Sequence, residues 1–153
     1  MIPSPLRLKS HFFTTIHVDA CPQGCETSGE GAFSSQVEFA RHEGDPAKWM
    51  VQLAIRKDAD DRERCPEYTF DIQVVGLFEV DTKYPPEKAE GLVRANGPAV
   101  LFGAIREMVA NLTARGPFPA VELPTVTFVD DASAPSAKPK SRPKARKPAR
   151  NAC

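Results

Sequence analysis

The chain has 153 residues, enough for one domain with a true hydrophobic core and too few for two comfortable ones. It holds 20 Lys or Arg and 20 Asp or Glu, so its formal net charge is zero, but residues 132–153 alone hold seven Lys or Arg and no acid. No stretch approaches the roughly 20 apolar residues of a membrane helix, and the N-terminus lacks the apolar core of a signal peptide. We therefore expect a cytoplasmic protein.

The first 80 residues alternate between apolar and polar side chains, as half-buried β-strands do. The first predicted strand carries Leu6, Leu8, Phe12, Ile16 and Val18 on one side. Two shorter strands, Phe33–Phe39 and Trp49–Ile55, are separated by Gly44, Asp45 and Pro46 and predict a hairpin. A fourth strand spans Tyr68–Val80. Short links between the later strands favour antiparallel pairing, since parallel neighbours need a longer crossover.

The second face of this predicted sheet is also partly apolar, because Phe13, Val75 and Leu77 fall on the parity opposite the core residues. Helices that cover one face would leave these side chains in water. We expect self-association to cover that face.

Helices are predicted after the strands. Pro85 and Pro86 can open a short helix through Glu87–Ala95, and Pro98 can open the main one, since proline is tolerated at a first helical position. An apolar stripe along the main helix consists of Leu101, Ile105, Met108 and Leu112. Gly116 can adopt a left-handed cap, and Pro117 prevents continuation. Strands followed by helices indicate an α+β fold with a four-stranded antiparallel sheet and helices packed on one face.

An extended run follows the main helix, and its prolines exclude a central strand, so it should lie over other structure. Its members are Phe118, Pro119, Leu123, Pro124, Val126 and Phe128. From Ala132 onward the chain is nearly all Ala, Pro, Ser, Lys and Arg, which predicts disorder. We therefore expect one domain over residues 1–131 and a disordered basic tail over residues 132–153. The tail could bind a polyanion without sequence preference, or act only as a solubilising or internally neutralised segment.

Motifs for catalysis are missing from the sequence: it has no GxxxxGK[ST], GxGxxG, HExxH or GxSxG pattern. We expect no enzyme activity and no cofactor. A zinc site could in principle use Cys21, Cys25, Cys65, His11, His17 and His42, but their spacing matches no closed four-ligand pattern, so no metal site is predicted. The four cysteines are expected to be reduced thiols.

The stretch from Pro98 to Phe128 resembles the SecB family of protein-export chaperones. The resemblance is carried by Pro98, Leu101, Phe102, Arg106, Glu107, Arg115, Gly116, Phe118, Pro119 and Phe128. Upstream, Gly76, Leu77 and Phe78 look like the family's Gly-aliphatic-Phe strand, and Ile16 also matches, so the resemblance covers residues 6–130.

This resemblance implies a homotetramer that holds unfolded precursor proteins in extended form without ATP and delivers them to the Sec translocase. SecB-like proteins place a peptide-binding groove between the sheet and the crossing loop, so the implied peptide-binding residues are Phe78, Phe118, Leu123, Val126 and Phe128. Taken without the family, the aromatic residues Phe78, Phe102, Phe118 and Phe128 are interpreted simply as core.

The resemblance also implies a contact with the translocation ATPase SecA through acidic residues on the outer sheet face. Asp19 and Asp71 match these positions, whereas Thr15 stands where the family has a further acid. Ordinary surface solubility explains two exposed aspartates as well. Two other functions remain open: a SecB-like chaperone dedicated to one client such as an antitoxin, and a polyanion-binding adaptor that acts through the basic tail.

Overall fold

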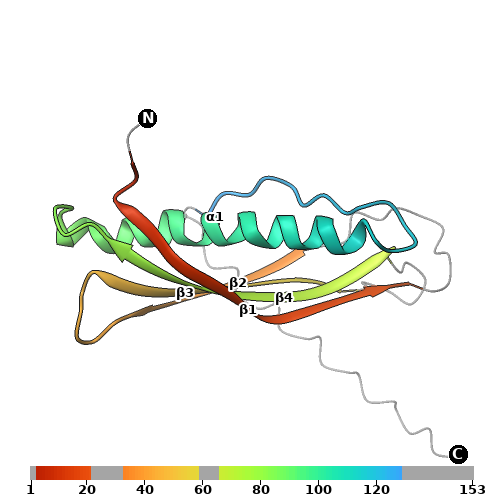
Figure 1. Ribbon diagram of the computed structural model, residues 1–153, viewed down its shortest axis with the longest axis horizontal. Coiled ribbons are helices and arrows are strands. Elements are labelled where there is room, and N and C mark those ends of the chain that lie inside the picture. The colour runs from red at the N-terminus through yellow and green to blue at the C-terminus, as the bar shows by residue number, and fades with distance from the viewer. Residues whose placement is uncertain (1–2, 22–32, 59–65, 129–153) are drawn as a thin grey trace, which may run out of the picture.

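A computed structural model describes residues 3–21, 33–58 and 66–128 of the chain. Its elements are β1 (Leu6–Ala20), β2 (Phe33–Arg41), β3 (Lys48–Lys57), β4 (Tyr68–Val80) and α1 (Pro86–Thr113). The four strands form one antiparallel sheet in the order β1-β4-β3-β2, and α1 lies across one face of it (Figure 1). The predicted α+β fold and the hairpin of the second and third strands are confirmed.

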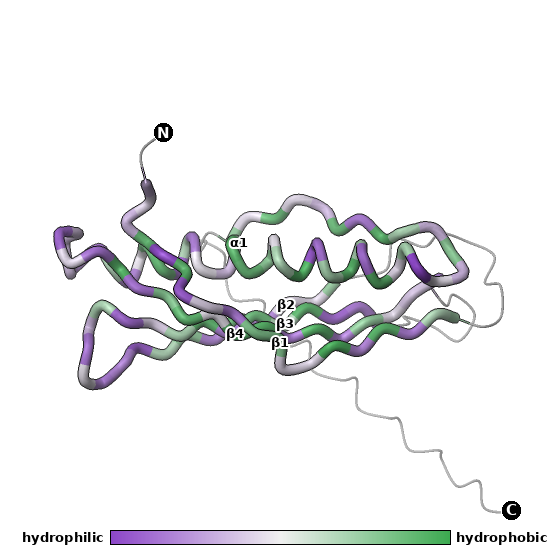
Figure 2. The backbone as a smooth tube through the Cα atoms, viewed as in Figure 1, coloured by the Kyte–Doolittle hydropathy of each residue, from purple (hydrophilic) through white to green (hydrophobic). Residues whose placement is uncertain are grey.

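The core lies between α1 and the sheet face beneath it, which we call the inner face; the opposite face is the outer face. Alternate residues of β3 and β4 supply most of it, because successive strand side chains point to opposite faces. A row on α1 at intervals of four residues packs against them. The buried residues include Trp49, Val51, Leu53, Ile55, Phe70, Ile72, Val74, Phe78, Val93, Leu101, Ile105 and Val109. Figure 2 shows apolar positions alternating along these strands.

Strand β1 departs from simple alternation. Its register with β4 shifts between Leu8 and Ser10 and again between Phe13 and Thr15, as β-bulges do. Between the two bulges the faces are exchanged: Phe12 is 51% exposed on the outer face, and Phe13 packs against the core. The prediction that Phe12 faces inward and Phe13 outward was wrong, because one inserted residue reverses every side chain that follows it.

Helix α1 is continuous, so the prediction of two helices meeting before Pro98 was wrong. Pro98 lies inside α1 and is fully buried, and Gly97 precedes it on the buried side. A proline within a helix removes one backbone hydrogen bond; here its ring and the bare Gly97 backbone form the surface that meets the sheet. Of the predicted apolar stripe, Leu101 and Ile105 are fully buried, whereas Leu112 is 36% exposed.

The role of Gly116 also differs from the prediction. Helix α1 ends at Thr113 and Gly116 donates its N–H to the Thr113 carbonyl, but its backbone is not left-handed. A Cβ atom at this position would overlap the hydroxyl of Tyr68. Glycine is needed here for close approach rather than for its backbone angles.

Candidate functional site

After α1, residues 117–128, which we call the crossing stretch, run back along the helix (Figure 1). Tyr68 fixes their start: its Oη lies 3.0 Å from the Thr113 carbonyl oxygen and 3.2 Å from that of Phe118, and accepts the Phe118 N–H at 3.1 Å. The Thr113 hydroxyl donates to the Val109 carbonyl at 2.8 Å and accepts the Val121 N–H at 2.8 Å. Side chains thus replace the missing strand hydrogen bonds of this proline-containing segment.

The far half of the crossing stretch forms one wall of an apolar groove of about 210 Å³, which we call the inner groove. Leu123 is 2% exposed and forms part of its base, whereas Val126 is 38% exposed. The Phe128 ring packs edge-to-face on Phe102, with centroids 5.9 Å apart. The lining is Phe33, Ser34, Ser35, Ile55, Phe102, Leu123, Pro124, Val126, Thr127 and Phe128.

The structure brings together three of the five residues that the resemblance implied for peptide binding: Leu123, Val126 and Phe128. Phe118 lies at the other end of the crossing stretch, with its ring 5.7 Å from that of Tyr68. Phe78 is 2% exposed and belongs to the core.

Phe33 also lines the inner groove, although it was not among the predicted site residues. It is 43% exposed at the first position of an edge strand, and its ring lies 5.9 Å from that of Phe70. The available signal in the sequence was an aromatic residue at the start of a short predicted strand. Only the fold places it opposite the crossing stretch.

Lys57 stands beside Phe33 on the inner face, since the two are paired across β2 and β3. Only 9% of the residue is exposed, and its Nζ lies 5.4 Å from the centre of the Phe33 ring. Burial lowers the pKa of the Lys57 amine, and the charge of Glu67 opposes that shift. A cation thus lies against Phe33, one of the residues that line the inner groove.

The outer face has a larger hollow of about 490 Å³, with Met50 and Leu77 each 42% exposed on it. It is lined by Lys9, Ala40, Arg41, His42, Lys48, Trp49, Met50, Leu77, Phe78 and Glu79. The prediction that Leu77 lies outward is confirmed; Val75 faces outward too, by its pairing with Phe12, but is only 5% exposed.

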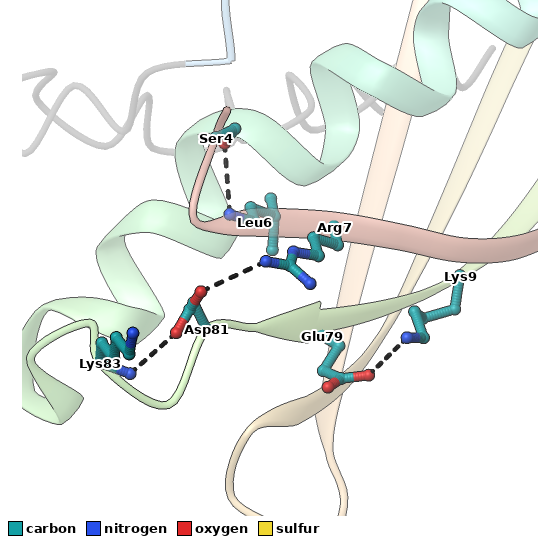
Figure 3. A network of polar contacts seen from close by, with 7 residues as sticks. All are labelled: Ser4, Leu6, Arg7, Lys9, Glu79, Asp81 and Lys83. Carbon is teal, nitrogen blue, oxygen red and sulfur yellow. Dashed lines mark hydrogen bonds and ion pairs between the residues drawn. The ribbon is translucent and has the colours of Figure 1, made fainter. Parts of the chain in front are cut away.

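Acidic side chains on the outer side of β1 and β4 are paired with basic ones. Arg56 contacts Asp71 Oδ2 through Nη2 at 2.6 Å, and this contact raises the pKa of the arginine. His17 Nε2 lies 2.7 Å from Asp19 Oδ2. Figure 3 shows two further ion pairs, Lys9 with Glu79 at 2.9 Å and Arg7 with Asp81 at 3.4 Å.

The remaining candidate residues do not form a site in the part of the chain that is described. Within residues 3–21, 33–58 and 66–128 no group of three or more His, Cys, Asp or Glu side chains is arranged to hold a metal ion. Cys25, Cys65 and the basic tail lie outside these residues. Among the described helices, none is long and apolar enough to cross a membrane.

Three comparisons with known proteins agree. The family model described as "Preprotein translocase subunit SecB" matches residues 15–130. The chain is 29% identical over 80 residues to a protein named protein-export protein SecB from Rhodospirillum centenum, covering 52% of this chain and 47% of that one. It is 31% identical over 90 residues to the protein of the same name from Alcanivorax borkumensis, covering 58% and 57%. The matched region thus spans about half the length of these relatives.

A solved structure shares the fold: a SecB-like chaperone from Mycobacterium tuberculosis in complex with a peptide from the HigA1 antitoxin. It superposes with a TM-score of 0.52 at 17% identity, covering 79% of this chain and 87% of that one. The family match extends over most of the chain and includes every element of the sheet and the helix at least in part. The chain belongs to the SecB family.

Proposed function

We propose that this protein is an ATP-independent chaperone that holds unfolded proteins by binding extended apolar segments in the inner groove. The observation that carries the proposal is the groove itself, an accessible apolar trough between the crossing stretch and the start of β2. Burial of client side chains supplies binding energy without a defined sequence, as a holdase requires. Preferential binding of unfolded chains then draws a slow-folding client away from its native state.

The free edge of β2 supports this mode of binding. In the described residues no strand pairs with the edge of β2 that faces away from β3. His42 donates its N–H to the Lys48 carbonyl, so its backbone groups point toward β3. Residues along an antiparallel pair alternate between hydrogen-bonded and non-hydrogen-bonded positions, and the latter point their backbone groups away from the partner strand. Counting back along β2, the outward backbone groups belong to Phe33, Ser35, Val37, Phe39 and Arg41. An extended client segment can pair with them while its side chains enter the groove.

An export chaperone and a chaperone dedicated to a single client, such as an antitoxin, differ in the partner that each one needs. Export requires delivery to SecA, for which Asp19 and Asp71 are the proposed contacts, in a cytoplasmic homotetramer. Both carboxylates are engaged by neighbouring basic side chains, and a SecA contact would have to compete with those pairs. The dedicated chaperone, which needs no contact with SecA, is the second candidate. The M. tuberculosis relative with an antitoxin peptide in its complex gives that candidate a precedent.

Placing a charge in the groove should abolish client holding. Val126→Asp sets a carboxylate in the apolar lining, and we expect at least a tenfold loss of affinity for an unfolded client, because a buried unpaired charge costs several kcal/mol. The matched control is Val100→Asp, which alters a similarly exposed aliphatic side chain on α1, outside the lining of the inner groove. The measurement is the refolding rate of a denatured, slow-folding precursor protein with stoichiometric amounts of each variant.

The same assay tests the tail. A version ending at Asp131 should arrest refolding as well as the full chain, because the groove lies in residues 33–128. If Val126→Asp arrests refolding as wild type does, the groove is not the binding site. If the shortened chain alone fails, the polyanion-binding adaptor becomes the better hypothesis.

A further inference from the structure

The edge strand β2 borders two hollows, one on each face of the sheet. Residues 33–35, at its start, line the inner groove. Ala40 and Arg41, at its end, and His42, which follows it, line the larger hollow of the outer face, which we call the outer hollow. The inner groove and the outer hollow therefore lie near opposite ends of one strand and on opposite faces of the sheet.

The outer hollow has an apolar floor that is open to a ligand. Met50 and Leu77 are paired across β3 and β4, and each is 42% exposed. Ala40 pairs with Met50 from β2. Because the alanine side chain is short, a long side chain placed outside β2 on this face can lie over Ala40 and reach Met50. Adjoining exposed apolar side chains of this kind mark surfaces that bind other chains.

The free edge of β2 connects the inner groove to the outer hollow. Its outward backbone groups begin at Phe33 and end at Arg41, so an extended segment that pairs with all of them passes both. Successive side chains of such a segment point to opposite faces. Those beside the start of β2 can enter the inner groove, and those beside its end can enter the outer hollow. Between them, Gln36 and Glu38 make the outer face beside β2 polar.

We infer that the outer hollow is a second client subsite, filled by the same extended segment whose other apolar side chain occupies the inner groove. This rests on the proposed function, because it adds a subsite to that mode of binding. Inward positions of β2 at the groove are 33 and 35, and outward positions at the outer hollow are 40 and 42, so the two differ by five, seven or nine. Client anchors therefore bind best at an odd spacing, near seven residues.

Four fluorescein-labelled peptides of equal length test this inference. They consist of Ser, Thr and Gln, with one phenylalanine, or with two phenylalanines at positions i and i+6, i and i+7, or i and i+8. Fluorescence anisotropy gives the Kd of each for the full chain. We expect the i, i+7 peptide to bind about tenfold more tightly than the other three, because only its two rings are buried together. The even spacings lie on both sides of seven, so spacing alone does not imitate the effect.

Substitutions assign the advantage to the outer hollow. Met50→Glu keeps a side chain of similar length but puts a charge on the floor, and it should reduce the i, i+7 peptide to the affinity of the even spacings. Phe12→Glu is the matched control, because Phe12 is 51% exposed on the same face and does not line the outer hollow. The readout is a ratio of Kd values within one variant, so a moderate change in stability does not imitate the effect. Circular dichroism checks that each variant is folded.

The outcomes separate the second subsite from the proposed function. Equal binding of the three two-phenylalanine peptides to wild type overturns the second subsite and leaves the inner groove in place. An i, i+7 advantage that persists in Met50→Glu overturns it as well. If no peptide binds, the second subsite is also overturned, and the refolding assay with Val126→Asp then decides separately whether the inner groove holds clients.

Discussion

Replacing Gly76 with alanine is expected to lower the free energy of unfolding by about 1–3 kcal/mol, the usual cost of overpacking a core. A Cβ atom on Gly76 would lie 2.6 Å from Leu101 Cδ2 and 2.7 Å from Phe78 Cε2. Both neighbours are buried and have little room to move. Opposite them, Gly97 of α1 faces Val51, the strand partner of Gly76, so helix and sheet approach each other closely here.

The matched control is Gly103→Ala, in the same helix that Gly76 contacts. A Cβ at Gly103 has nothing within 4 Å, so alanine should stabilise the protein by up to about 1 kcal/mol through its higher helix propensity. Urea denaturation followed by circular dichroism measures both changes. If Gly76→Ala unfolds at the wild-type midpoint or later, the close approach of α1 to β4 is not present in solution.

Tyr68→Phe is expected to destabilise the protein by about 1–3 kcal/mol, because it removes the hydroxyl that accepts the part-buried Phe118 N–H and lies within hydrogen-bond distance of the Thr113 and Phe118 carbonyl oxygens. The loss should concentrate in the crossing stretch, whose start these hydrogen bonds fix. Trypsin cleavage after Arg115 should therefore be faster in the variant, and client affinity should fall as the wall of the inner groove loosens.

Tyr84→Phe serves as the comparison, since Tyr84 is the only other tyrosine and its hydroxyl contributes no hydrogen bond among the described residues. Its midpoint in urea and its rate of cleavage should match wild type. Equal cleavage rates for Tyr68→Phe and wild type would mean that the crossing stretch is held by its apolar contacts alone.

The strands were predictable because burial of one face imposes a period of two, and Trp49, Val51, Leu53 and Ile55 follow it without interruption. The bulges of β1 were not predictable, because nothing in the sequence marks an inserted residue. Lys9 and Thr14, the residues inserted there, are of types that also occur in regular strands. The prediction of two helices meeting before Pro98 was wrong because it, too, used local rules alone. Local rules end a helix there, yet burial against the sheet holds the helix together through it.

The candidate site was only partly predictable, because part of its lining comes from residues that are distant from one another in the sequence. Leu123, Val126 and Phe128 are neighbours in sequence, and a proline-containing extended run signals a segment that lies over other structure. Phe33 and Ile55, by contrast, join the groove only through tertiary pairing. Phe78 was predicted to bind peptide because it matches a motif of the family, but its side chain is buried in the core. The pairing of Asp71 with Arg56 also required the sheet register.

The strand order has a consequence for synthesis of the protein on the ribosome. β1 is made first but pairs with β4, so that Leu6 meets Val80 only after the other three strands have been translated. β2, β3 and β4 can pair with their sequence neighbours as they emerge, whereas β1 must wait through a long loop closure. During that interval Phe12 and Phe13 stand unprotected on an extended segment. For part of its own biogenesis, a newly made chain therefore presents the kind of apolar segment that a finished copy is proposed to hold.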